Sequence, residues 1–331
     1  MNLSEEWVYP WQQSLWQRLW QQRANHRLPH ALLLSGNPGL GKKHFARVVA
    51  KSVLCLERNE WACGRCRSCR WFSAGSHPDF LSVSEENSAA IIKVDAIRTL
   101  TEMLHLTPQC STYRVAIIYP AGAMNRAATN ALLKTLEEPA GQALLMLVQH
   151  QSSYLPATVV SRCQRMVLTH TDARMAEAWL KAQRSMGDAE GWLLKMAYQA
   201  PLLALQWAEL GYRPLRNQVL MGLWQLRRRE VSPLMLAKQW SVHDPVVLLQ
   251  IVLTLGMDIV RVQCHLGVEW LIHSDCLVQL RAFSALITPQ SVLSWLQQGQ
   301  AVLRILHESV RIQWLLWLES WLLSWEKGAT C

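Results

Sequence analysis

A phosphate-binding loop is indicated by the segment Gly36-Asn-Pro-Gly-Leu-Gly-Lys-Lys43, in which the pattern G-x-x-x-x-G-K is complete up to Lys42. Gly36, Gly39 and Gly41 would let backbone N–H groups turn toward phosphate oxygens, and Lys42 would reach the β- and γ-phosphates. An apolar run precedes the loop and a helical pattern follows it, which is the setting that the motif requires. The segment therefore predicts a loop built to surround phosphate.

The same loop lacks the groups that hold a catalytic metal. The residue after Lys42 is normally a Ser or Thr whose hydroxyl binds Mg²⁺, but here it is Lys43, and an ammonium cannot ligate a cation. Hydrolysis also needs carboxylates at the end of the neighbouring strand, whereas the predicted strand at 114–119 runs into Pro-Ala-Gly-Ala. These two losses predict no Mg²⁺ and no hydrolysis. ATP binding stays open, since the loop could also serve only to shape the fold.

A metal site is predicted by four cysteines with the spacing C-x7-C-x2-C-x2-C, namely Cys55, Cys63, Cys66 and Cys69. The two overlapping C-x2-C steps let the thiolates converge on one tetrahedral ion, and Gly64 lies where the turn favours a positive φ. Because four protein ligands leave no open position, the prediction is structural Zn²⁺. A nucleic-acid-reading zinc finger is the alternative, although no recognition helix with histidines follows. The other cysteines are expected to be buried thiols: Cys110, Cys163, Cys264, Cys276 and Cys331.

Alternating strands and helices position these groups over residues 1–168. Apolar runs predict strands at 31–35, 114–119, 143–148 and 166–168, and helical patterns predict helices at about 42–54 and 122–138. Strands separated by helices predict a parallel, doubly wound α/β sheet. We expect this segment to be a P-loop domain with the cysteine module at 55–69 inserted into it.

Helical patterns replace the strands from residue 171 onward. They predict a small helical lid domain at 169–211 and a larger helical domain at 212–331. Four tryptophans recur at steps of three and four and mark one apolar helix face: Trp314, Trp317, Trp321 and Trp325. We interpret this face as internal core, with a surface for packing against partner subunits as the alternative.

Composition is compatible with two or three domains, because the chain has 331 residues, half of them hydrophobic. A net charge of +9 suits work near nucleic acid, although many ordinary soluble proteins are equally basic. The first ten residues lack the apolar core of a secretory signal. No run approaches the roughly 18–20 uncharged apolar residues of a membrane span, the closest being 312–325. These features predict a cytoplasmic protein with reduced cysteines.

A phosphate loop followed within one helix by a four-cysteine module resembles bacterial clamp-loader subunits of the AAA+ family. Five further segments are similar to that family: Trp7–Trp11, Gly75–Asp79, Val94–Arg98, Asn130–Pro139 and Ser161–Cys163. They cover residues 7–168 well, and beyond them only length and helical character agree. Asp95 is expected to be a helix N-cap, and His77 to be structural.

Within this family the chain resembles the delta-prime subunits of DNA polymerase III. The gamma and tau motor subunits keep an intact phosphate loop and an acidic pair, and delta-prime subunits have lost both, as this chain has. Motor subunits also carry a nucleotide-sensing arginine in the second domain, whereas the corresponding stretch at 199–205 has none. The resemblance implies that Arg162 acts in trans as an arginine finger. On the motif alone, a surface arginine near Thr158 paired with a carboxylate is equally compatible.

The resemblance implies a non-hydrolysing subunit of the DNA polymerase holoenzyme. It would join gamma or tau motor subunits and a delta subunit in a five-membered ring, held through the helical collar at 212–331. The ring would load the beta sliding clamp onto primed DNA. Two alternatives remain: an active P-loop ATPase motor subunit, and a zinc-dependent DNA-binding protein.

Overall fold

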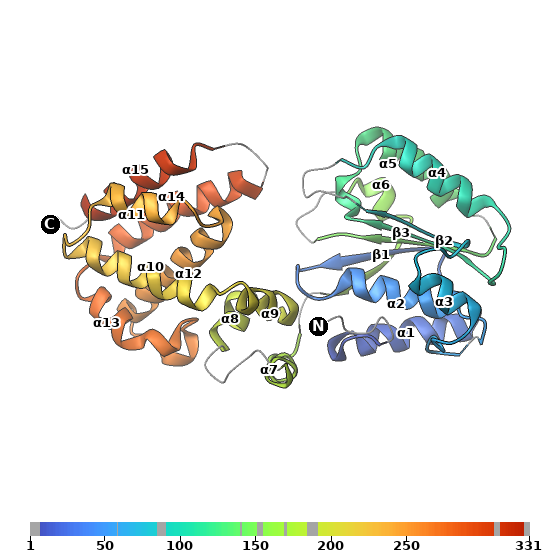
Figure 1. The fold of residues 1–331 in the computed structure, drawn as a ribbon, viewed down its shortest axis with the longest axis horizontal. Coiled ribbons are helices and arrows are strands. Elements are labelled where there is room, and N and C mark those ends of the chain that lie inside the picture. Colours follow the sequence, from blue (N-terminus) through green and yellow to red (C-terminus); the bar gives the residue numbers. More distant parts are fainter. Residues whose placement is uncertain are drawn as a thin grey trace. The chain divides into compact units, whose positions relative to one another are not determined.

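A computed structural model describes residues 7–57, 59–84, 91–139, 141–150, 155–168, 171–183, 191–307 and 312–327 (Figure 1). The chain forms two compact units. Unit 1 contains residues 1–178 and 199–203, and unit 2 contains residues 179–198 and 204–331. The division into three domains at 168 and 211 stays a prediction, and Cys331 lies outside the described residues.

Unit 1 is built on a five-stranded sheet in the order β2-β3-β4-β1-β5, and every neighbouring pair is parallel. The strands are β1 (Ala31–Gly36), β2 (Phe80–Ser84), β3 (Arg114–Tyr119), β4 (Ala143–Val148) and β5 (Gln164–Leu168). The predicted parallel α/β sheet is confirmed. The sequence prediction missed β2, an edge strand whose Phe-Leu-Ser-Val-Ser sequence contains no long apolar run.

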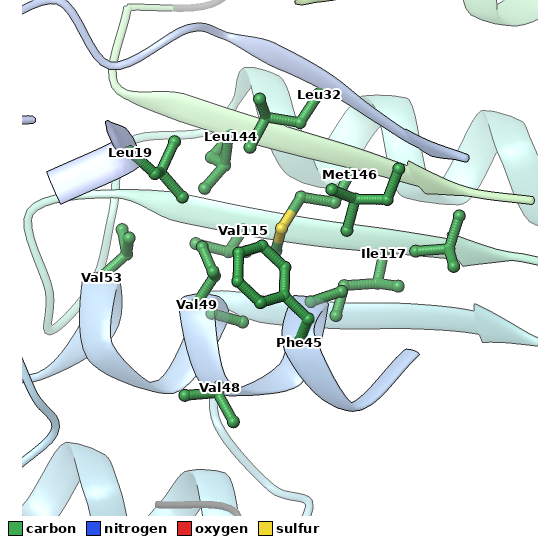
Figure 2. Packing of buried hydrophobic residues seen from close by; sticks show 14 of the residues in the cluster. Leu19, Leu32, Phe45, Val48, Val49, Val53, Val115, Ile117, Leu144 and Met146 are labelled. Carbon is green, nitrogen blue, oxygen red and sulfur yellow. The ribbon is translucent and has the colours of Figure 1, made fainter. Parts of the chain in front are cut away.

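Helices cover both faces of this sheet (Figure 1). The helices of unit 1 include α1 (Gln13–Ala24), α2 (Lys42–Leu54), α3 (Arg67–Ser73), α4 (Val94–His105), α5 (Arg126–Glu137) and α6 (Ala157–Val160). Alternate residues of a strand point to opposite faces. Leu32 and Leu34 accordingly pack into one core with Phe45 of α2 (Figure 2), while Leu33 packs into a second core with Leu132 of α5. The two cores therefore lie on opposite faces of the sheet.

The start of α4 differs from the prediction at Asp95. The N-cap residue is Lys93 and the helix begins at Val94, so that Asp95 lies inside the first turn. Its carboxylate is 3.4 Å from the guanidinium of Arg98. The predicted cap is therefore wrong, although a negative charge in the first turn still favours the helix dipole.

The larger part of unit 2 is helical, as predicted. Its helices include α8 (Gly191–Met196), α10 (Tyr212–Arg227), α11 (Pro233–Trp240), α12 (Pro245–Gln263), α13 (Leu277–Ser284), α14 (Pro289–His307) and α15 (Trp314–Lys327). Trp321 and Trp325 of α15 are buried, and the ring of Trp321 stacks on Trp295 of α14 at 4.1 Å between centroids. The interpretation of this face as core is confirmed for these two residues, whereas Trp314 and Trp317 are half-buried.

The most apolar helix is α12 and not the predicted segment at 312–325. Among the described residues, α12 is the one single helix with the length and composition of a membrane span, and half of its apolar window is buried inside the protein. It contacts α10, α13 and α14. A core helix of a soluble protein passes the same test of length and composition.

Candidate functional site

The phosphate loop joins β1 to α2 and has the backbone shape that its glycines predict. Gly36, Gly39 and Gly41 have φ values of 143°, 74° and 76°, which only glycine adopts readily. A side chain at Gly36 would also collide with the carbonyl oxygen of Leu168 in β5. The loop therefore has the backbone conformation that the sequence predicted.

The side chain of Lys42 is turned back onto its own loop. Its ammonium donates to the carbonyl oxygens of Gly36 at 2.9 Å and Asn37 at 2.6 Å, and the residue is only 4% exposed. Burial lowers the pKa of Lys42 to about 8. Two of the three N–H donors of this ammonium group are therefore used by carbonyl oxygens of its own loop.

Other segments of unit 1 pack closely against the loop. A Cβ atom on Gly39 would lie 2.4 Å from Leu203 Cβ, and one on Gly41 would lie 2.6 Å from the ring of Tyr9. The buried amide of Gln12 donates to the carbonyl oxygens of Leu40 and Gly41 at 2.7 and 3.1 Å. The chain itself therefore holds the loop in place.

Basic and aromatic side chains pack together at the end of β3, next to the phosphate loop. The ammonium of Lys43 lies 5.0 Å from the ring centre of Tyr119, the last residue of β3, in a cation–π contact. His150, just after β4, packs edge-on against Tyr119. Burial and the positive charge of Lys42 both lower the pKa of His150. These groups cannot supply the carboxylate oxygens that Mg²⁺ prefers.

Arg162 lies in the turn between α6 and β5 and is presented to solvent. Its neighbours Val159 and Cys163 are buried in the core, so the arginine between them points outward. Its guanidinium lies 2.6 Å from Glu137 and donates to the carbonyl oxygen of Thr158 at 2.8 Å. The carboxylate partner foreseen for a surface arginine is thus present, as Glu137.

The phosphate loop lies at the carboxyl ends of the parallel strands, and Arg162 lies at their amino ends. Gly36 pairs with Leu168 at the carboxyl ends of β1 and β5, while Arg162 precedes the amino end of β5 at Gln164. A parallel strand advances about 3.3 Å per residue, so β5 alone separates the two by about 13 Å. The contacts with Glu137 and Thr158 hold the guanidinium of Arg162 at the amino ends of the strands. Arg162 therefore lies at the opposite ends of the strands from the phosphate loop of its own chain.

The four predicted cysteines converge in one cluster. Cys55 caps the end of α2, Cys66 caps the start of α3, and all four sulfurs lie within 4.8 Å of one another. Four thiolates about 2.3 Å from one zinc ion would lie roughly 3.8 Å apart, which this cluster can reach with small adjustments. Gly64 has a φ of 70°, as the turn predicts.

Backbone N–H groups point at three of these sulfurs. The N–H groups of Cys63, Cys66 and Cys69 donate to the sulfurs of Cys55, Cys63 and Cys66, each at 3.4 Å. For Cys66, burial alone would raise the pKa, but hydrogen bonds from Cys69 and Leu56 lower it to about 7. Such bonds favour the thiolate form that binds metal.

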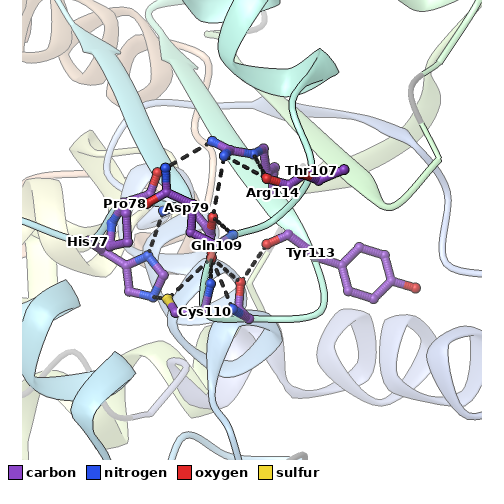
Figure 3. A network of polar contacts seen from close by, with 9 residues as sticks. His77, Pro78, Asp79, Thr107, Gln109, Cys110, Tyr113 and Arg114 are labelled. Atoms are coloured by element: carbon purple, nitrogen blue, oxygen red, sulfur yellow. Dashed lines mark hydrogen bonds and ion pairs between the residues drawn. The ribbon is translucent and has the colours of Figure 1, made fainter.

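A buried polar network next to this cluster was missed by the sequence analysis (Figure 3). Asp79 is fully buried, and its carboxylate accepts hydrogen bonds from the backbone N–H groups of Gln109, Cys110 and Ser111 at 2.7–3.0 Å. Although burial opposes the charge, these bonds hold the pKa of Asp79 well below its usual range. Arg114 lies 3.7 Å from the same carboxylate. Asp79 thus anchors the loop that leads into β3.

His77 links this network to the cysteine module. Its Nδ1 accepts from the N–H of Asp79 at 3.0 Å, so Nε2 carries the hydrogen and donates to Ser68 Oγ at 2.8 Å. The Ser68 hydroxyl in turn donates to the carbonyl oxygen of Leu54. His77, Asp79 and Cys110 are close enough to hold an ion, but their polar atoms are already hydrogen-bonded. These contacts agree with the structural role predicted for His77.

The remaining described cysteines differ in their burial. Cys163 and Cys276 are buried, as predicted, and burial raises the pKa of the Cys163 thiol to about 11. Cys110 is only partly buried, and its thiol donates to Asp79 at 3.2 Å. Cys264 is exposed at the C-cap of α12, so the prediction of a buried thiol is wrong there.

Replacing Asp79 with asparagine is expected to destabilise unit 1 by about 3–5 kcal/mol, the range for removing one partner of a buried ion pair. Because the pKa of Asp79 is lowered by folding, its contribution is complete above its unfolded pKa of about 3.9 and is lost progressively as the pH falls from that value toward the much lower folded pKa. Urea denaturation at pH 7 and at about pH 2 measures both effects. Asp95→Asn, at an exposed carboxylate, is the control. Equal stability of wild type and Asp79→Asn at pH 7 would contradict the anchoring role.

Two family models match the chain in sequence. One, described as DNA polymerase III, delta subunit, matches residues 11–172, and another, described as the C-terminal part of that subunit, matches residues 214–327. DNA polymerase III subunit delta-prime of Pseudomonas aeruginosa is 37% identical over 71% of each chain. The chain belongs to the DNA polymerase III delta-prime family.

A second delta-prime protein is similar over nearly the whole chain. Subunit delta-prime of Yersinia pestis is 30% identical over 96% of this chain and 95% of its own length, so the similarity to delta-prime proteins extends into unit 2. Among solved structures, a gamma subunit-related protein of Thermotoga maritima is 18% identical with a TM-score of 0.48, covering 97% of this chain and all of its own.

Proposed function

We propose that this chain is the delta-prime member of a clamp-loader ring and completes the ATP site of a neighbouring motor subunit with Arg162. The observation that carries the proposal is the position of Arg162, partly exposed at the amino ends of the strands, whereas the chain's own phosphate loop lies at their carboxyl ends. From this position, Arg162 would contact the γ-phosphate of a nucleotide that is bound to another subunit. The guanidinium would spread positive charge over phosphate oxygens that gain charge in the transition state.

The chain itself is proposed to hydrolyse no ATP. Lys43 replaces the metal-binding hydroxyl, and Tyr119-Pro120 and Gln149-His150 stand where strands β3 and β4 end. Lys42 is bound to loop carbonyls, and the described residues that follow β3 and β4 at these strand ends, Pro120, Gln149 and His150, bring no carboxylate for Mg²⁺. The loop thus keeps its fold and has lost its catalysis.

The partners follow from the family. We propose gamma or tau motor subunits and a delta subunit in a five-membered ring, held through the helices of unit 2. The ring would act in the cytoplasm and load the beta sliding clamp onto primed DNA. A net charge of +9 suits a ring that surrounds the phosphate backbone without sequence preference.

The four-cysteine cluster is proposed to hold one structural Zn²⁺. The donor set fits, because Cys55, Cys63, Cys66 and Cys69 provide four sulfurs within 4.8 Å of one another. When bound, the ion would tie the end of α2 to the start of α3. With four protein ligands the site is closed to substrate.

The absence of catalysis is tested on the purified chain. We expect no Mg²⁺-dependent ATP turnover above background, and no change on Lys42→Ala, because the metal ligands are missing. Lys43→Thr should also stay inactive, since Tyr119 still stands where a carboxylate is needed. A colorimetric phosphate assay with a motor subunit as positive control makes the measurement. Turnover that Lys42→Ala abolishes would instead favour an active ATPase.

A further inference from the structure

The guanidinium of Arg162 is held on two sides by its own chain. Nη2 lies 2.6 Å from Glu137 Oε1, and Nη1 donates to the carbonyl oxygen of Thr158 at 2.8 Å. Glu137 is the last residue of α5, and Thr158 belongs to α6. The side chains of Arg162 and Glu137 nevertheless remain 36% and 50% exposed. The guanidinium is thus fixed in direction while it still faces solvent.

These two contacts leave most of the guanidinium unused. An arginine carries five N–H donors in one rigid plane, and only two of them are needed for Glu137 and Thr158. The other donors are in a fixed geometry that suits paired oxygens of a phosphate. A phosphate could therefore bind without displacing either anchor.

We propose that Glu137 is a positioning residue that orients Arg162 before it meets the phosphate of a neighbouring subunit. The proposal rests on the trans role of Arg162 given above. A long side chain loses its rotamer freedom when it binds, and ordering it during folding removes that loss from the transition state. Because the pair is exposed, it adds little to the stability of the fold. The main effect of the ion pair is to fix the orientation of the Arg162 side chain.

A carboxylate beside an arginine has a second effect of opposite sign. The charge of Glu137 partly neutralises the guanidinium and repels an approaching phosphate. Orientation and charge can be separated, because glutamine keeps an oxygen that accepts the hydrogen bond and loses the charge. Alanine removes both. The two substitutions therefore distinguish a positioning role from a restraining one.

The test uses the chain assembled with motor subunits and measures DNA-stimulated ATP hydrolysis at the neighbouring site. We expect Glu137→Ala to lower kcat about three- to tenfold, the value of ordering one long side chain, with KM for ATP unchanged. Glu137→Gln should restore most of the lost rate. Glu138→Ala is the matched control, since Glu138 is the next residue and is also exposed. Thermal unfolding of all variants should match that of the wild type.

Each other outcome has a definite meaning. An unchanged or faster rate in Glu137→Ala, or equal slowing by alanine and glutamine, overturns the positioning role if Arg162→Ala still loses activity. An unchanged rate in Arg162→Ala overturns the trans role itself, and the positioning role with it. The two failures are therefore distinguishable in one series.

Discussion

Replacing Arg162 with alanine is expected to slow ATP hydrolysis at the neighbouring motor site by about 10³- to 10⁵-fold, the range for arginine fingers supplied in trans. The side chain is exposed at the amino edge of the sheet, so its removal should leave folding and ring assembly intact. Other sites of the ring keep their own residues. Single-turnover hydrolysis on primed DNA should therefore be measured together with the total rate. The variant should lack the phase that comes from the site next to Arg162.

Two further variants sharpen this prediction. Arg162→Lys keeps the charge and loses the planar pair of donors, so it should also be slow. Arg165→Ala removes another exposed arginine, three residues further along in β5, and should behave as wild type. Full hydrolysis by an assembly that contains Arg162→Ala would remove the arginine finger from the proposed function.

Removing zinc is expected to have the second large effect. A site of four thiolates contributes about 10–16 kcal/mol of metal-binding free energy in small zinc domains. The purified chain should contain about one equivalent of zinc, as expected for one closed four-thiolate site. Chelation or Cys69→Ser should lower the thermal stability of unit 1, because Cys69 is buried where α3 meets the end of α2.

The control for this prediction is also in the chain. Cys264→Ser changes an exposed thiol in unit 2 and should alter neither zinc content nor unfolding. Elemental analysis and thermal unfolding with and without chelator provide the measurement. A metal-free chain with unchanged unfolding would contradict the zinc assignment.

The features that sequence predicted well are local. The phosphate loop is defined by glycines within six positions, and the cysteine cluster is set by spacings of two and seven residues along one segment. Strands β1, β3 and β4 are continuous apolar runs because both faces of the sheet are covered. In each case the feature depends on residues that are close together in the sequence.

The features that sequence could not predict join distant residues. Asp79 receives bonds from a loop that begins thirty residues later at Gln109, and Glu137 meets Arg162 across twenty-five positions. Leu203 lies against Gly39 although strands β2 to β5 lie between these two residues in the sequence. Such pairs depend on how the chain folds back in space, and no periodicity records them. One signal in the sequence was His77-Pro78-Asp79, in which two titratable side chains lie two positions apart.

The most direct test of the central proposal is a structure of the assembled ring with primed DNA and a γ-phosphate transition-state analogue. We predict that the Arg162 guanidinium lies within hydrogen-bond distance of the analogue in the neighbouring subunit, with Glu137 still bound to it. No magnesium should be coordinated beside Lys43. A nucleotide with a fully coordinated magnesium at Lys42 and Lys43, with Arg162 far from any phosphate, would contradict the account.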